Sequence, residues 1–296
     1  MDVRQLRYFL GVVDHKGFTR AAEALLVAQP SLSQSIRGLE KSVGAPLFHR
    51  VGRGVELTAA GEQLVGPARQ VLRDLDAAQA AVDSTRTLSS GRLDLIAMPS
   101  PGVEPLTALL RDFHARYPGL SLNVDAAFTP EQVVQHVDSG SSEIGLLGAA
   151  GRPGTAALRV LHLEFQPLIL ISPPGTAVRG ESVQPSELGG LDVVISQRGS
   201  LMRQLVDDAL ASGAPVNIVA EVAHRTSLLP LVQAGVGHTV MPESWRDTAT
   251  AGGCVVHRID PGEVLDIFLV ARTSGLTPAA EAFIDMVESR YALPHS

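Results

Sequence analysis

The stretch "VAQPSLSQSIRGLE", residues 27–40, decides how the first part of this chain is interpreted. Its spacing predicts a single helix, because Pro30 suits the first helical turn, where its missing N–H costs no hydrogen bond. Apolar residues form one stripe along this helix: Leu32, Ile36 and Leu39. The opposite face carries hydrogen-bonding side chains with a single charge among them: Ser33, Gln34 and Arg37. Ordinary solvated faces carry more charged residues, so we expect this face to bind a partner.

The sequence around this helix predicts a winged helix-turn-helix over residues 1–58. Residues 3–13 carry apolar side chains at helical spacing, and "RAAEALL" (20–26) is a short helix with Thr19 as a candidate N-cap. Two glycines, at positions 52 and 54, then join two short extended runs into a hairpin that forms the wing. In this arrangement the later helix enters the DNA major groove, where Ser, Gln and Arg side chains suit base edges and phosphates. A solvated polar helix face is the alternative interpretation.

The charge distribution favours a nucleic-acid partner, although the whole chain has a net charge of −7. Residues 1–60 hold eight Lys and Arg against five Asp and Glu, a net charge of +3. The remaining 236 residues hold 16 against 26, a net charge of −10. This asymmetry predicts a basic module on an acidic body.

Length and composition indicate a soluble protein of two or three domains. The chain has 296 residues, of which 45% are hydrophobic and 19% charged, and no apolar run is long enough to span a bilayer. The N-terminal "MDVRQLRYFL" has charged residues where a signal peptide needs an apolar segment, so we expect a cytoplasmic protein without membrane contact. The single cysteine, Cys254, lies in the apolar run "CVVHRI" and is expected at a buried strand position.

A long linker helix with an apolar seam is predicted over residues 59–88. Every third or fourth position is apolar or small: Leu57, Gly61, Leu64, Ala68, Val71, Leu75, Ala78 and Val82. Such heptad spacing is typical of a helix that pairs with a second helix. Since no other segment has a matching seam, we expect a homodimer formed through this helix. Packing of the helix on its own domain is the alternative.

Beyond a hinge at residues 88–93, strands and helices alternate and predict an α/β domain over residues 91–296. The expected strands share apolar, mostly branched side chains and lie at 93–97, 120–124, 144–148, 168–172, 192–196, 216–222, 237–241 and 267–271. "TPEQ" opens a helix in which Thr129 is the N-cap and Gln132 is positioned for a capping box.

The alternation fits two α/β lobes with a cleft between them. Lobe I is expected at about 91–162 and 267–296, and lobe II at about 163–266. Ligands of open α/β sheets bind beyond the carboxyl ends of the strands, near helix N-termini. The cleft is therefore the expected ligand site.

Nearly the whole chain resembles a LysR-type transcriptional regulator. The N-terminal match is specific and includes "AAEAL", "QPSLSQSI", "LE" and "LF" followed by Arg50. The C-terminal match is looser and includes "GRLDLIA", "SSEIGLL", "LVQAGVGHTVMP" and "TPAAEAFIDMV". The resemblance implies an N-terminal winged helix-turn-helix, a long linker (dimerisation) helix and a two-lobed, periplasmic-binding-protein-like α/β effector domain.

The resemblance also implies partners and DNA contacts. It implies a homodimer, commonly assembled into a homotetramer, that binds inverted repeats of double-stranded DNA and responds to a small-molecule effector; contact with RNA polymerase is left open. The helix that starts at Gln29 and Pro30 would contact bases or phosphates through Ser31, Ser33, Gln34 and Arg37. Contacts to the DNA backbone are expected from Thr19, Arg20, Arg50 and Arg53.

The same resemblance places an effector pocket between the lobes. In lobe I the matching residues are Ser100, Pro101, Phe128 and Thr129. In lobe II they are Gln197, Arg198, Ser200, His224 and Thr226. Hydroxyl groups at helix N-termini favour an anion such as a carboxylate, and Arg198 or His224 would pair with its charge. Thr129 and Ser200 are equally explained as helix caps, and His224 by a hydrogen bond to a backbone carbonyl.

No motif for catalysis, a cofactor or a metal stands out. "GVGHTV" lacks the third glycine of a dinucleotide motif, no His pair has metal-ligand spacing, and no G-x-S-x-G elbow is present. We therefore expect a ligand-responsive regulator that is not an enzyme and carries no cofactor. The alternatives are a sensor or solute-binding protein without a DNA role, which would need export, and an enzyme on the same scaffold.

Overall fold

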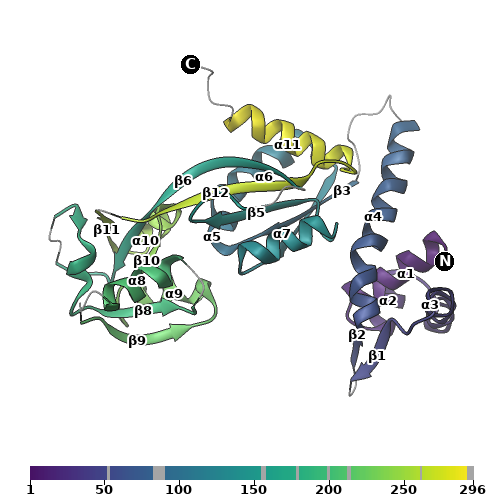
Figure 1. Cartoon of the computed structure of the whole chain (residues 1–296), viewed down its shortest axis with the longest axis horizontal. Helices are drawn as coiled ribbons and strands as arrows, with labels where there is room; N and C mark the ends of the chain where they lie inside the picture. The colour runs from purple at the N-terminus through teal and green to yellow at the C-terminus, as the bar shows by residue number, and fades with distance from the viewer. Residues whose placement is uncertain are drawn as a thin grey trace.

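A computed structural model describes residues 1–51, 54–82, 91–154, 158–177, 180–198, 201–211, 215–260 and 262–291. The first domain is the predicted winged helix-turn-helix (Figure 1). Its elements follow the predicted order: α1 (Val3–Asp14), α2 (Phe18–Ala24), α3 (Gln29–Val43), β1 (Phe48–Val51) and β2 (Gly54–Leu57). No helix in the described part of the chain combines the length and the apolar character that a membrane span requires.

The ends of these helices differ from the prediction in two places. Thr19 is not the N-cap of α2, because Gly17 takes that position with φ 155° and the helix begins at Phe18, two residues before the predicted start at residue 20. Only glycine adopts such a positive φ without strain. The helix α3 runs three residues past the predicted end at residue 40 and stops at Gly44, which has φ 82°. A left-handed glycine is a common way to end a helix.

The apolar stripe of α3 faces the core of the DNA-binding domain. Leu32, Ile36 and Leu39 are buried there together with Leu6, Phe9, Leu10, Ala21 and Leu47. The rings of Phe9 and Phe48 lie 5.4 Å apart between centroids, which joins α1 to the first strand of the wing. This packing leaves the polar face of α3 toward solvent.

The first half of the apolar seam predicted for helix α4 (Ala59–Val82) packs against its own chain. Ala68 is fully buried in the core of the DNA-binding domain, and Leu64 is half-buried against the same core. Farther along, Val71 and Leu75 are 42% and 44% exposed. The first half of the seam thus follows the alternative interpretation, in which the helix packs on its own domain. Only the later positions are left for a partner helix. The side chains of Ala78 and Val82, and the predicted hinge before residue 91, lie outside the described residues.

Lobe I of the second domain is a mixed sheet covered by helices. Its strands are β3 (Gly91–Ala97), β4 (Leu120–Ala126), β5 (Ile144–Ala149) and parts of β6 (Leu158–Ser172) and β12 (Val264–Arg272). As the βαβαβ pattern predicts, β3 lies parallel to both β4 and β5, whereas β12 is antiparallel to β5. The helices are α5 (Pro99–Val103), α6 (Leu106–Arg116), α7 (Pro130–Asp138) and α11 (Pro278–Tyr291).

Lobe II continues the same large sheet and adds a separate parallel pair of strands. The continuing strands are β6, β7 (Ser182–Val183), β10 (Thr239–Pro242) and β11 (Val255–Ile259). The parallel pair is β8 (Asp192–Ser196) and β9 (Asn217–Val222). The helices are α8 (Leu201–Ala211), α9 (Leu228–Gln233), α10 (Arg246–Ala251) and the short turns at 185–188, 225–227 and 243–245. Cys254 is buried as expected, one residue before β11, and burial raises the pKa of its thiol.

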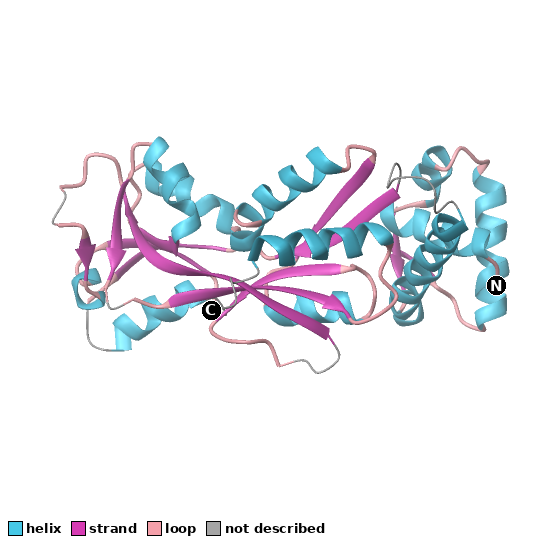
Figure 2. Ribbon diagram, turned by 90° about the horizontal axis from the view of Figure 1, so that it is seen from above, coloured by secondary structure: helices cyan, strands magenta, loops and turns pink. Residues whose placement is uncertain are grey.

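Two long strands run across both lobes (Figure 2). The strand β6 has 15 residues and is much longer than the predicted strand at 168–172. It pairs with β12 over residues 158–167 and with β10 and β11 over residues 168–172. In the first part of β6, buried residues are interspersed with more exposed, often polar ones. This part of the strand therefore contains no continuous apolar run and was not predicted. Both predicted lobe boundaries, at 162/163 and 266/267, therefore fall inside these crossing strands.

Candidate DNA-binding surface and ligand pocket

The polar face of α3 forms an exposed surface on the DNA-binding domain. Five of its predicted contact residues are exposed: Gln29, Pro30, Ser31, Gln34 and Arg37. Ser33 is half-buried, at the wall of a hollow that α3 forms with Phe48 and His49 of the wing. The N-cap residue of α3 is Ala28, whose side chain makes no capping hydrogen bond. Its backbone dipole is therefore available to an anionic group such as a phosphate.

The other predicted DNA contacts lie on α2 and the wing. Thr19 and Arg20 are exposed, and Arg20 Nη2 donates to the backbone carbonyl of Lys16. Arg50 lies in β1, but its side chain is outside the described residues, as is the whole of Arg53. The contact made by each of these residues therefore stays a prediction.

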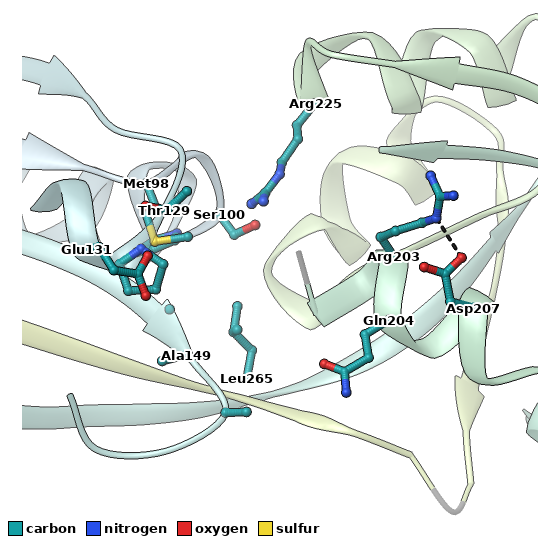
Figure 3. A pocket seen from close by; sticks show the side chains of 14 residues that line it. Met98, Ser100, Thr129, Glu131, Ala149, Arg203, Gln204, Asp207, Arg225 and Leu265 are labelled. Carbon is teal, nitrogen blue, oxygen red and sulfur yellow. Dashed lines mark hydrogen bonds and ion pairs between the residues drawn. The ribbon is translucent and has the colours of Figure 1, made fainter. Parts of the chain in front are cut away.

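A pocket of about 630 Å³ lies between the two lobes (Figure 3). Lobe I supplies mostly small, apolar or hydroxyl residues: Met98, Ser100, Pro101, Thr129, Pro130, Glu131, Gly148, Ala149 and Ala150. Lobe II supplies longer polar side chains, and β12 adds one apolar residue: Arg203, Gln204, Asp207, Arg225 and Leu265. The volume lies within the range of about 300–1,000 Å³ that is usual for small-molecule sites.

Three of the four lobe I residues that the resemblance implied line this pocket. Thr129 caps α7, and Gln132 completes the predicted capping box. Ser100 is 3% exposed on the short helix α5. Ser100, Pro101 and Thr129 all line the pocket, whereas Phe128 does not line it and is 52% exposed.

The lobe II wall differs from the one expected. Gln197, Arg198, His224 and Thr226 are exposed and do not line the pocket, and Ser200 lies outside the described residues. The lobe II wall is instead formed by Arg225, the residue after His224, and by one face of α8. That face carries Arg203, Gln204 and Asp207. The spacing of that polar face was visible in the sequence, but a polar helix face is usually solvated and gave no reason to place it in a pocket.

The two pocket arginines have different electrostatic environments. Arg203 is buried, its Nε donates to Asp207 Oδ1 at 2.8 Å, and its Nη1 lies 3.1 Å from Glu221 Oε2. The Asp207 hydrogen bond, followed by the contact to Glu221, raises the pKa of Arg203. Arg225 has no ion-pair or hydrogen-bond partner for its side chain among the described residues, and its partial burial lowers the pKa of its guanidinium. Its charge is thus uncompensated on the pocket wall.

The linker helix α4 also contacts lobe I directly. Gln70 Nε2 donates to the carbonyl of Gly275 at 3.1 Å, and Arg73 donates through Nη2 to the carbonyl of Gly140. Arg73 is 7% exposed, and its burial lowers the pKa of its guanidinium. A Cβ at Gly66 would lie 2.2 Å from the carbonyl oxygen of Ser139, so the close approach of α4 requires glycine.

The pocket and the linker contact lie at opposite ends of the same helix. The first residues of α7 line the pocket, and residues 139–140, which follow its last turn, touch α4. This helix has nine residues and is therefore about 13 Å long at about 1.5 Å per residue. The helix α7 thus connects the pocket with the surface on which α4 rests.

The arrangement defines a class of protein: a bacterial DNA-binding regulator that carries its own ligand-binding domain. Residues 3–62 match the family model for bacterial regulatory helix-turn-helix proteins of the lysR family, and residues 86–292 match the LysR substrate binding domain. The chain belongs to the LysR family of transcriptional regulators. It is therefore not an enzyme, and the solute-binding alternative without a DNA role does not apply.

Similar proteins extend over the full length of the chain. The HTH-type transcriptional regulator IlvR of Caulobacter vibrioides is 32% identical over 99% of this chain and 100% of its own. The Hca operon transcriptional activator HcaR of Escherichia coli K12 is 31% identical over 99% of each chain.

Solved structures share the fold. A variant of full-length OxyR from Pseudomonas aeruginosa has a TM-score of 0.71 at 22% identity, covering 97% of this chain and 95% of that one. Full-length CbnR complexed with its target DNA has a TM-score of 0.69 at 22% identity, covering 98% of this chain and 100% of that one.

Proposed function

We propose that a small anion, such as a carboxylate, binds between the lobes and controls the DNA binding of this LysR-family regulator. Arg225 carries the proposal, because its uncompensated guanidinium lines the pocket. The hydroxyl groups of Ser100 and Thr129 are further donors on the facing wall. A ligand anion would supply the partner that a partly buried arginine needs.

We infer that the exposed face of α3 binds operator DNA in the major groove. Arg37 and Gln34 contact base edges, while the residues at the start of α3 and on α2 position the helix on the phosphates. Two copies of the chain pair through the exposed part of α4 and contact the two halves of an inverted repeat. The dimer assembles further into a tetramer and acts in the cytoplasm. It binds at promoters, where it can contact RNA polymerase.

Arg225→Gln is expected to abolish ligand-induced stabilisation while leaving the unliganded fold intact. The wild-type chain should show a raised thermal midpoint with at least one member of a carboxylate panel, and the variant with none, because a charge-assisted hydrogen bond contributes about 1.5–3 kcal/mol. The matched control is Arg198→Gln, which changes an exposed arginine outside the pocket. Equal stabilisation of the wild-type and Arg225→Gln chains would refute the anion site.

Arg73→Ala is expected to uncouple the ligand from the DNA. Because Arg73 joins α4 to the loop after α7, the variant should bind the ligand as the wild type does but show less than half of its ligand-induced change in operator affinity. Operator affinity with and without ligand gives the coupling, and ligand affinity is measured separately. Arg111→Ala, an exposed change on α6, serves as the control. Full coupling in Arg73→Ala would show that α7 does not act through this contact.

A further inference from the structure

Among the described residues, the pocket has one charged side chain of each sign without an ion-pair partner, and the two come from opposite lobes. Asp207 is engaged by Arg203, so this pair needs no ligand. Arg225 on lobe II and Glu131 on lobe I have no ion-pair partner for their side chains among the described residues. Both residues line the pocket, together with Ser100 and Thr129, and Figure 3 shows the guanidinium of Arg225 pointing toward Ser100.

The position of Glu131 also has a purely structural explanation. It is exposed in the first turn of α7, where a carboxylate interacts favourably with the helix dipole. That effect explains an acidic residue in this turn, but it does not require the residue to line a pocket that has an uncompensated arginine on its other side. A simple anion would satisfy Arg225 and leave Glu131 repelling the bound charge.

Apart from the charged residues, the two hydroxyl residues and Gln204, the pocket wall is apolar. Met98, Pro101, Pro130, Ala149 and Leu265 line the same pocket as the two charged residues. These residues offer no hydrogen-bond partner to a polar ligand tail. Burial of a hydrocarbon group against them would be favourable, because apolar surface is removed from water. The pocket thus combines an anion partner, a cation partner and an apolar surface.

We propose that the ligand is a zwitterion of the α-amino-acid type with an apolar side chain. Its carboxylate pairs with Arg225 and accepts from the hydroxyl groups of lobe I, its ammonium group donates to Glu131, and its side chain packs on Met98 and Leu265. The inference rests on the proposed anion site and adds the ammonium subsite to it. A bound zwitterion bridges the two lobes through opposite charges.

The test is calorimetric titration of the full chain with matched pairs of ligands. The pairs are valine and 3-methylbutanoate, norleucine and hexanoate, and phenylalanine and 3-phenylpropanoate, with pentylamine as the cation alone. At least one amino acid should bind about tenfold or more tightly than its acid, since a charged hydrogen-bond partner contributes that much. In Glu131→Gln this preference should disappear, whereas Glu281→Gln, another acidic residue in the first turn of a lobe I helix, should retain it.

The outcomes distinguish the zwitterion inference from the proposed anion site on which it rests. If an acid binds as tightly as its amino acid and loses affinity in Arg225→Gln, the anion site stands and the zwitterion is wrong. If none of the acids or amino acids binds, both proposals fail. Preference retained in Glu131→Gln would place the ammonium group elsewhere and overturn the role of Glu131. Thermal unfolding without ligand verifies that each variant is folded.

Discussion

The Arg37→Ala chain is expected to lose operator affinity by about 30-fold or more without loss of stability. Arg37 is exposed on α3, opposite the buried stripe, so its removal leaves the core intact. One bidentate arginine contact to a base contributes about 1–3 kcal/mol. A dimer makes that contact in both half-sites, so the expected loss is about 2–6 kcal/mol, or about 30-fold and upward. Gln34→Ala should change affinity in the same direction.

The measurement begins with genomic fragments selected by the wild-type protein. Affinity for a selected fragment is then measured at several salt concentrations, with Arg116→Ala as a control that removes the same charge from an exposed site on the other domain. A loss confined to the selected sequence indicates a base contact. An equal loss on all sequences, with a salt slope lower by about one per contact, indicates a phosphate contact. Unchanged affinity in both α3 variants would refute the assignment of this helix.

The Leu75→Asp chain is expected to sediment as a monomer of 31.2 kDa and to bind operator DNA weakly. Leu75 is 44% exposed on α4, in the part of the seam that its own chain leaves uncovered. An aspartate there would be buried unpaired in a helix pair, which is unfavourable. Because two half-sites must be bound together, loss of the dimer should also weaken operator binding strongly. An intact dimer in this variant would exclude the proposed pairing surface.

Leu64→Asp provides the contrasting case. Leu64 packs on the core of the DNA-binding domain, so a charge at that position should lower the free energy of unfolding by on the order of 3 kcal/mol. Leu75→Asp should leave the unfolding of that domain nearly unchanged. Urea denaturation at equal protein concentration compares the two variants. Equal stability of both variants would contradict the assignment of Leu64 to the domain core and of Leu75 to the surface that pairs with a second chain.

Local patterns were sufficient for much of this molecule. The apolar stripe of α3, the glycines of the wing and the capping box at Thr129 each depend on residues within a few positions of one another. Such interactions are determined by side-chain spacing and backbone geometry, so they can be recognised before any tertiary contact is known. The pocket residues of lobe I, Ser100 and Thr129, were expected from the resemblance to the LysR family and not from local spacing alone.

The sequence by itself determined the order of the elements and the exposed polar face of α3. Only the tertiary structure decided that α4 divides its seam, that β6 and β12 cross between the lobes, and that Arg225 lines the pocket while Arg198 does not. The reason is physical. Periodicity tells which face of an element is apolar, but the partner of each face depends on contacts between residues that are far apart along the chain.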